Sequence, residues 1–196
     1  DISACSWTAD GHVIFTGARS AVYTWNPSDM SVSVESAGDA YPVLDVVRTC
    51  GDNLWVAGHG RLWARPAGGA FKQIRYGSPA PVADLQCLDD GTVLGVGAAG
   101  MVFVADVSTA RLVPLQDIAT DLHSAVVVDG RIVVTGSRGT LLAGISPEDL
   151  LPVETGLLDD LTVSTPLTGG RMLLGGSRGI LALFDGETLT VIRKPS

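Results

Sequence analysis

Residues Ile132–Ala143 read IVVTGSRGTLLA, and residues Met172–Ala182 read MLLGGSRGILA. Each stretch is an apolar, partly β-branched run, then a Gly-Ser-Arg-Gly segment, then a second apolar run. Runs of this kind favour β-strands, and the glycines between them favour a tight turn. The two stretches therefore predict the same two-stranded hairpin at two places in the chain, which indicates a repeat.

The repeat extends through the whole sequence with a period near 40 residues. The glycine that ends the second strand of each unit recurs five times, at Gly17, Gly58, Gly97, Gly136 and Gly176. A turn segment precedes that strand in every unit, at 10–11, 51–53, 90–91, 129–130 and 169–170. Three of these segments read Asp-Gly, which favours a hairpin because both residues tolerate positive φ. Two independent markers therefore give the same five units.

Each unit is predicted to contain four short antiparallel strands, which in the third unit lie at about 85–88, 92–96, 101–105 and 112–115. A repeated four-stranded unit of this length is typical of a β-propeller blade, because one blade cannot bury both of its faces alone. We predict an all-β, single-domain β-propeller over residues 1–196, with blades at about 1–40, 41–79, 80–118, 119–157 and 158–196. We expect these five blades to close the ring; the alternative is that they form part of a larger propeller.

The composition restricts the partners. The formal net charge is −8 and the pI is near 4.6, which disfavours nonspecific binding to nucleic acid or to anionic membranes. No apolar run reaches the length of about 20 residues that a membrane-spanning helix needs, so we expect a soluble protein without membrane insertion. The sequence begins at Asp1, which fits either a mature form after signal removal or an excised domain. We expect an extracytoplasmic location, periplasmic or secreted.

Cysteine spacing and the usual catalytic motifs give no sign of a cofactor. Cys5, Cys50 and Cys87 are an odd number without metal-site spacing, so we expect no metal and three buried cysteines that pack as small apolar residues. The chain lacks a Gly-Lys-Ser/Thr phosphate loop and a Gly-x-Ser-x-Gly elbow. These observations predict no cofactor and no enzymatic activity.

The strand sequences also resemble a known family. Residues 44–47 read LDVV and residues 54–58 read LWVAG, and together they resemble the repeats of the photosystem II assembly and stability factor family, which are related to bacterial-neuraminidase-like propellers. The resemblance covers all five units at the level of the blade, and it implies a propeller that acts in binding or assembly. The Asp-Gly-Gly-x-x-Trp hairpin of that family is altered here, since residues 184–189 read FDGETL.

One face of the predicted propeller collects equivalent basic side chains. The turns between the second and third strands carry Arg19, His59, Arg138 and Arg178, with Ala99 in the third unit. Arginine binds carboxylates and phosphates through two parallel hydrogen bonds, so convergent arginines could hold an acidic group or a C-terminus. The alternative is that they form scaffold salt bridges with the acids near each inner strand, which are Asp1, Asp45, Asp84, Asp121 and Asp160.

Two further kinds of site have some basis in the sequence. A ring of aspartates is compatible with glycoside hydrolysis, but a catalytic pair needs two acids in different environments, and here the same acid recurs once in each unit. Tyr41 and Tyr76 lie in loops between units and are expected to be exposed, in a patch with His59 and Trp63. We predict a non-enzymatic module that binds a protein or peptide through Arg19, Arg138, Arg178, His59, Tyr41 and Tyr76; the alternatives are a carbohydrate-binding propeller and, third, a glycoside hydrolase.

Overall fold

The structure, a computed structural model, describes residues 1–38 and 43–194 and is all-β. Its strands form five antiparallel sheets of four strands, each in sequence order. The first two sheets contain β1 (Ile2–Trp7), β2 (Val13–Gly17), β3 (Ala21–Asn26) and β4 (Ser31–Ser36), then β5 (Val46–Cys50), β6 (Asn53–Gly58), β7 (Arg61–Arg65) and β8 (Lys72–Ile74). The third contains β9 (Val82–Cys87), β10 (Val93–Gly97), β11 (Val102–Ala105) and β12 (Ala110–Leu112). The last two contain β13 (Leu122–Val128), β14 (Arg131–Gly136), β15 (Leu141–Gly144) and β16 (Leu151–Pro152), then β17 (Leu161–Pro166), β18 (Met172–Gly176), β19 (Leu181–Phe184) and β20 (Leu189–Arg193). We refer to these sheets as blades 1 to 5.

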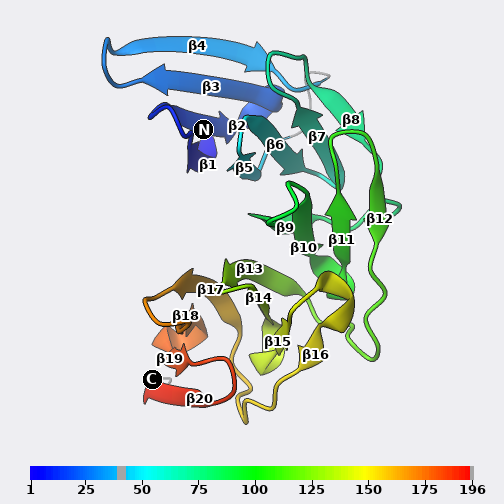
Figure 1. The fold of residues 1–196 in the computed structure, drawn as a ribbon, viewed down its shortest axis with the longest axis vertical. Helices are drawn as coiled ribbons and strands as arrows, with labels where there is room; N and C mark the ends of the chain where they lie inside the picture. Colours follow the sequence, from blue (N-terminus) through cyan, green and yellow to red (C-terminus); the bar gives the residue numbers. More distant parts are fainter. Residues whose placement is uncertain (39–42, 195–196) are drawn as a thin grey trace.

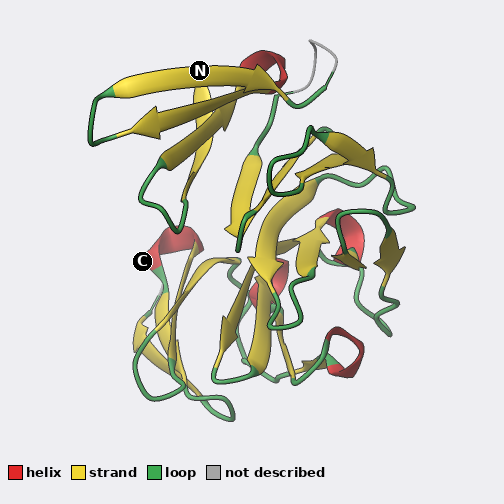
Figure 2. Ribbon diagram, turned by 45° about the horizontal axis from the view of Figure 1, so that its top comes forward, coloured by secondary structure: helices red, strands yellow, loops and turns green. Residues whose placement is uncertain are grey.

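The five blades stand side by side around a common axis, with their first strands innermost (Figure 1). Consecutive inner strands pack on one another: β1 on β5, β5 on β9, β9 on β13 and β13 on β17. The predicted five-bladed architecture is therefore confirmed. The short 3-10 turns lie between strands (Figure 2), and no helix among the described residues is long and apolar enough to cross a membrane.

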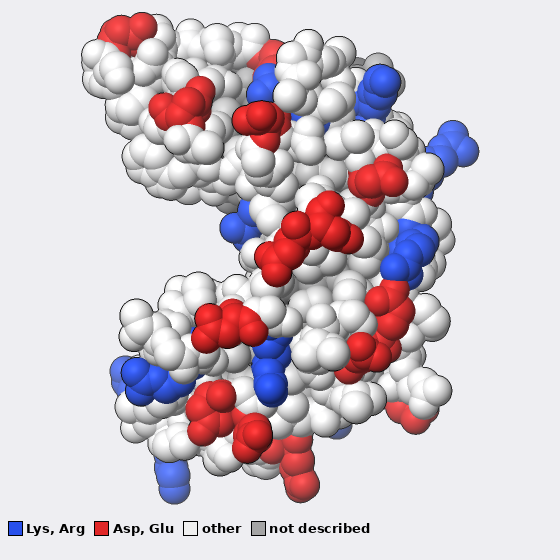
Figure 3. All heavy atoms as spheres, viewed as in Figure 1, with Lys and Arg blue, Asp and Glu red and all other residues white. Residues whose placement is uncertain are grey.

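The ring stays open in the part of the chain that the structure describes. Blades 1 and 5, which carry the two termini, lie at the ends of an arc with a gap between them (Figure 1), and the space-filling view shows the same opening (Figure 3). We expected the five blades to close by side-chain packing, and they do not. The angle between neighbouring blades is set by the side chains packed between them, and this angle cannot be read from the repeat length.

Separate apolar cores lie between successive blades. Ile14 and Val22 of blade 1 pack against Leu54, Val56 and Trp63 of blade 2. The other three cores join blades 2 and 3, 3 and 4, and 4 and 5 in the same way. Each inner blade is therefore covered on both faces, which explains why its strands read as nearly continuous apolar runs.

The recurrent glycine at the end of each second strand is required by a close backbone approach. A Cβ added to Gly58 would lie 1.9 Å from the carbonyl oxygen of Val43, and one added to Gly176 would lie 1.8 Å from that of Asp160. No side chain fits at such distances, because contacts below 3.0 Å are essentially never seen for Cβ atoms. The marker that revealed the repeat is thus a packing constraint between the first and second strands of each blade.

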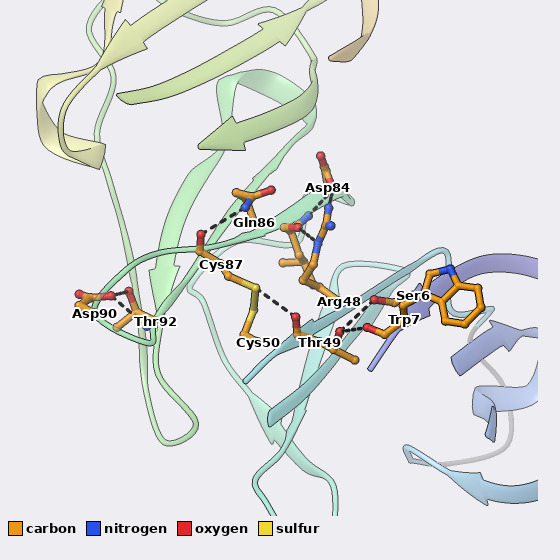
Figure 4. Close-up of a disulfide and its surroundings, with 11 residues drawn as sticks. Ser6, Trp7, Arg48, Thr49, Cys50, Asp84, Gln86, Cys87, Asp90 and Thr92 are labelled. Atoms are coloured by element: carbon orange, nitrogen blue, oxygen red, sulfur yellow. Dashed lines mark hydrogen bonds and ion pairs between the residues drawn. A yellow bond between two sulfur atoms is a disulfide. The ribbon is translucent and has the colours of Figure 1, made fainter. Parts of the chain in front are cut away.

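Two of the three cysteines are bonded to each other. Cys50, at the end of β5, and Cys87, at the end of β9, form a disulfide with an S–S distance of 2.07 Å (Figure 4). Cys5 is free and exposed. The expectation of three buried thiols is therefore wrong, because Cys50 and Cys87 lie at the ends of adjacent inner strands, where stacking of the blades brings their sulfur atoms together.

Candidate functional site

The face predicted to carry the basic side chains is built from the β2–β3 turns and their equivalents, together with the loops between blades. We call it the loop face. In blades 3 and 4 the turn is hydrogen-bonded to the loop that leads to the next blade: Gly100 N–H donates to the carbonyl oxygen of Thr120 at 2.8 Å, and Gly139 N–H donates to that of Asp159 at 2.8 Å. The predicted grouping of these two kinds of loop on one face is confirmed.

The basic residues occupy left-handed backbone positions at the centre of these turns. The φ angles are 62° at Arg19, 50° at His59, 56° at Ala99, 58° at Arg138 and 54° at Arg178. All five side chains are exposed. The left-handed region costs an L-residue roughly 1–2 kcal/mol, a cost that glycine avoids. Four of the five blades therefore display a basic side chain at a position where its backbone is strained.

The aspartates beside these turns bind backbone N–H groups of the preceding blade. A carboxylate oxygen of Asp121 accepts from Ala99 N–H at 2.9 Å, and one of Asp160 accepts from Arg138 N–H at 2.9 Å. Each acid therefore supports the strained residue of the preceding turn. The guanidinium groups of Arg19 and Arg138 make no ion pair within the described residues.

Arg178 differs from the other two turn arginines. Its Nε donates to Oδ1 of Asp159 at 2.6 Å, and the Asp159 side chain is only 8% exposed. Because Arg138 is tied through its backbone to Asp160 and Arg178 through its side chain to Asp159, these two arginines lie around the loop between blades 4 and 5. Arg19 belongs to blade 1, at the other end of the arc (Figure 1), so the structure does not bring the three arginines into one cluster.

The five aspartates proposed as a ring do not occupy equivalent positions. In each blade, the carbonyl oxygen of one residue at the start of the inner strand lies close to the recurrent glycine. This residue is aspartate in blades 1, 4 and 5 (Asp1, Asp121 and Asp160), but it is Val43 in blade 2 and Pro81 in blade 3. Asp45 and Asp84 come later along their inner strands than this position. The idea of an equivalent acid in every blade is therefore wrong, because Asp45 lies two residues after Val43 and Asp84 three residues after Pro81, the positions that match Asp1, Asp121 and Asp160.

Asp84 connects three blades. It forms an ion pair with Arg48 of blade 2, with an Nη2–Oδ1 distance of 3.2 Å (Figure 4). Its other oxygen accepts from Ala125 N–H of blade 4 at 3.0 Å and from the Ser124 hydroxyl at 3.3 Å. The side chain is 19% exposed. These contacts use the acceptor capacity of the carboxylate, so Asp84 stabilises the inner strands and is poorly suited to act as a catalytic acid or base.

The two candidate tyrosines do not form the expected patch. Tyr41 lies outside the described residues. Tyr76 is 3% exposed, its ring stacks on Phe103 with centroids 4.7 Å apart, and its hydroxyl donates to the carbonyl oxygen of Ala80 at 2.7 Å. Burial raises the pKa of Tyr76 to about 12. Trp63 is buried as well, so the expectation of an exposed aromatic contact at Tyr76 is wrong. Among the described members of that group, His59 is the exposed one.

The loop face also holds an apolar hollow that sequence reasoning missed. It has a volume of about 350 Å³ and lies around the turn of blade 3, with Ala99 at its rim and Met101, Leu112, Pro114 and Ile118 among its lining residues. The sequence contains one signal for this hollow. The turn of blade 3 carries Ala99 where the other four blades carry a basic residue, and the hollow lies beside that turn. His59 and Arg138 are not among the residues that line the hollow; they lie on the turns of the neighbouring blades 2 and 4, on the same face.

A larger cavity lies on the opposite face, which carries the hairpins between first and second strands. Its volume is about 580 Å³, between blades 1 and 2, and its lining includes Asp10, Asp52 and Arg65. Hydrogen bonds from the Thr8 hydroxyl and then from His12 lower the pKa of Asp10 to about 2. Arg65 is occupied by an ion pair with Glu35. Within the described residues, no group of three His, Cys, Asp or Glu side chains could hold a metal ion.

Comparison with known proteins identifies the fold and no family. No family model and no curated protein sequence matches the chain. Among solved structures, virginiamycin B lyase from Staphylococcus aureus aligns with 100% of this chain and 70% of its own, at TM-score 0.86 and 7% identity. A catalytically inactive histidine-to-alanine variant of that lyase, solved with quinupristin, gives TM-score 0.88 at 10% identity over the same shares of both chains.

Other propellers match as well. The C-terminal WD40 domain of Sif2 aligns over 97% of this chain and 58% of its own, at TM-score 0.73 and 14% identity. At these identities the likeness extends to the fold alone. The chain is a β-propeller arc of five blades, and the narrower resemblance to photosystem II assembly factors has no support from a sequence match.

Proposed function

We propose that the chain is a non-enzymatic binding module whose loop face takes a peptide segment of a partner protein, with an apolar anchor and acidic flanks. The observation that carries the proposal is the arrangement of strained basic turns around the apolar hollow. Backbone strain at a non-glycine residue is a reason to look for function, because a glycine would remove it. Here the side chains kept at that cost are exposed and basic.

The chemistry of the face fits such a peptide. An apolar side chain of the partner would fill the hollow beside Ala99, and its acidic groups would pair with His59 and Arg138 of the neighbouring blades. A desolvated apolar contact supplies most of the affinity in interfaces of this kind, and peripheral charges mainly set orientation and association rate. The centres of the five turns carry basic residues or alanine and no acid, so they favour an acidic peptide although the chain as a whole is acidic.

The acids of the inner strands support a binding role over hydrolysis. Asp121 and Asp160 bind backbone N–H groups, and Asp84 is held by an arginine and a neighbouring blade. Glycoside hydrolysis needs two carboxyl groups free to exchange protons with the substrate. Assembly of a larger complex, which the resemblance to assembly factors implied, is one form of the binding that we propose. The Cys50–Cys87 disulfide favours an oxidising, extracytoplasmic compartment.

The test uses an array of synthetic peptides, half of which carry acidic residues around a central Leu, Phe or Met, followed by fluorescence anisotropy of the best binder. The double variant His59→Glu/Arg138→Glu should abolish binding, because it places acidic groups on the two blades beside the hollow, where the acidic flanks of the peptide would lie. The matched control is Lys72→Glu/Arg171→Glu, which makes at least as large a change in charge away from the loop face and should retain binding. The proposal fails if both double variants lose binding equally, or if Ala99→Trp, which should block the hollow, leaves the affinity unchanged.

An enzymatic alternative comes from the neighbouring structure. The similarity to virginiamycin B lyase makes quinupristin a reasonable first compound to test. Mass spectrometry of quinupristin incubated with the chain should show no new product under our proposal. A product that disappears in His123→Ala, whose ring lies 2.9 Å from the Ser137 hydroxyl, would support the alternative.

A further inference from the structure

The two end faces of the arc are apolar surfaces of the kind that other blades cover. Within the arc, the third strands of blades 1, 2 and 3 carry an aromatic residue at the same position: Tyr23, Trp63 and Phe103, each opposite the residue two before the recurrent glycine. Trp63 and Phe103 face the preceding blade and are 3% and 0% exposed. Tyr23, which has no preceding blade, is 37% exposed.

The rest of this face of blade 1 has the same character. By the strand register, Trp7 and Val32 lie in one row of side chains, and Phe15, Tyr23 and Val34 lie in the next. None of these side chains is charged, and Trp7 is 65% exposed. A contiguous aromatic and aliphatic face of this kind is unusual on a solvated surface and marks an interaction site.

Blade 5 presents the opposite end face. Its Leu173 and Leu181 occupy the positions of Val133 and Leu141 in blade 4, which are buried under blade 5. Leu173 and Leu181 are only partly buried, and Val163 beside them is 55% exposed. At both ends of the arc, these side chains are therefore more exposed than their equivalents in the inner blades. The reason is the same at each end, because an end blade lacks a neighbour on one side.

The curvature of the arc indicates what the occupant is. The whole chain superposes on virginiamycin B lyase with a TM-score of 0.86, so its blades follow one another at the angles of that propeller. Five blades that span 70% of the lyase chain leave room for about two more of the same size. A second copy of this five-bladed arc is too large for that space, and packing copies end to end would give an open, non-closing assembly.

We infer that both end faces are docking surfaces for further four-stranded blades, about two in number, supplied by residues of the same polypeptide outside the 196 of this sequence. The blade that follows blade 5 covers Val163, Leu173 and Leu181, and the blade that precedes blade 1 covers Trp7 and Tyr23. The inference is independent of the proposed peptide site, which lies on blades 2 to 4.

The experiment compares this 196-residue chain with the intact polypeptide purified from its source. Oxidative footprinting with mass spectrometry measures the reactivity of Trp7, with the fully buried Trp55 as an internal reference. In the 196-residue chain Trp7 should react readily, and in the intact polypeptide it should be as protected as Trp55. Light scattering should show a monomer in both cases.

A pair of variants supplies a second readout. Tyr23→Glu should lower the melting temperature of the intact polypeptide by about 6 °C or more, because it buries an unpaired charge between blades. The same change should move the melting temperature of the 196-residue chain by less than about 3 °C, because the side chain is already partly exposed there. The control Ser33→Glu, on the exposed outer strand β4, should have little effect in either protein.

Three results would overturn the inference. The first is a Trp7 that reacts equally in both proteins, which would mean that the end face is free. The second is an intact polypeptide no longer than this chain. The third is a 196-residue chain that dimerises and thereby protects Trp7, which would assign the end faces to a second copy.

Discussion

Removing the covalent link between blades 2 and 3 should cost a large part of the stability of the chain. The disulfide joins Cys50 and Cys87, which are 37 residues apart in sequence. In the chain-entropy model a cross-link of this span restricts the unfolded state enough to contribute about 4 kcal/mol at 25 °C. A domain of this size loses about 2–4 °C of melting temperature for each kcal/mol, so reduction should lower the melting temperature by roughly 8–16 °C.

The assay is unfolding by heat and by urea, both followed by tryptophan fluorescence, with Trp55 and Trp63 as buried reporters in blade 2. Three samples separate the link from the side chains: oxidised protein, protein reduced with dithiothreitol, and the double variant Cys50→Ala/Cys87→Ala. The reduced protein and the double variant should unfold at similar, lower urea concentrations. Cys5→Ala, at an exposed free thiol, is the matched control and should behave like the oxidised protein.

A thiol titration tests the premise directly. The unfolded, unreduced protein should contain one reactive thiol, that of Cys5, and three after reduction. Three thiols without reduction would show that the disulfide is absent. An unchanged urea midpoint after complete reduction would refute the argument that the link between the inner strands holds the two blades together.

Three further predictions concern single residues. Asp84→Ala should destabilise the chain by about 2–3 kcal/mol in urea unfolding, because it removes charge-assisted hydrogen bonds and leaves Arg48 without its partner; a loss below about 0.5 kcal/mol would contradict the role of Asp84 in joining the blades. Gly95→Ala should cost about 3 kcal/mol or more, since the added Cβ would lie 2.0 Å from Cζ of Phe103, and the paired variant with Phe103→Leu should recover part of the loss. The pKa of Asp10 is lowered to about 2 from 3.8. The contribution of this carboxylate to stability is therefore fully present above about pH 4 and is lost as the pH falls through about 2. A carboxyl NMR titration that gives an ordinary pKa for Asp10 would refute the hydrogen bonding at this hairpin.

The sequence by itself determined the blade and its repetition. The recurrent glycines and the Asp-Gly turns are local requirements. Each glycine allows a carbonyl oxygen at the start of the first strand to come close to the end of the second, and each turn needs residues that tolerate positive φ. Such requirements act within about 40 residues, so they leave a mark at a fixed spacing. For the same reason, the equivalent positions of the basic residues in the β2–β3 turns and their counterparts were enough to assign these residues to one face.

Relations between blades were decided by the tertiary structure. Cys50 and Cys87 are separated by nearly one repeat, which places them on adjacent inner strands, but only the stacking of those strands brings the sulfur atoms into bonding distance. Tyr76 stands beside prolines in a loop, and its burial depends on Phe103 of the next blade. The shape of the whole arc follows from the same cause: the angle between blades depends on side chains packed across each interface, which a period in the sequence does not record.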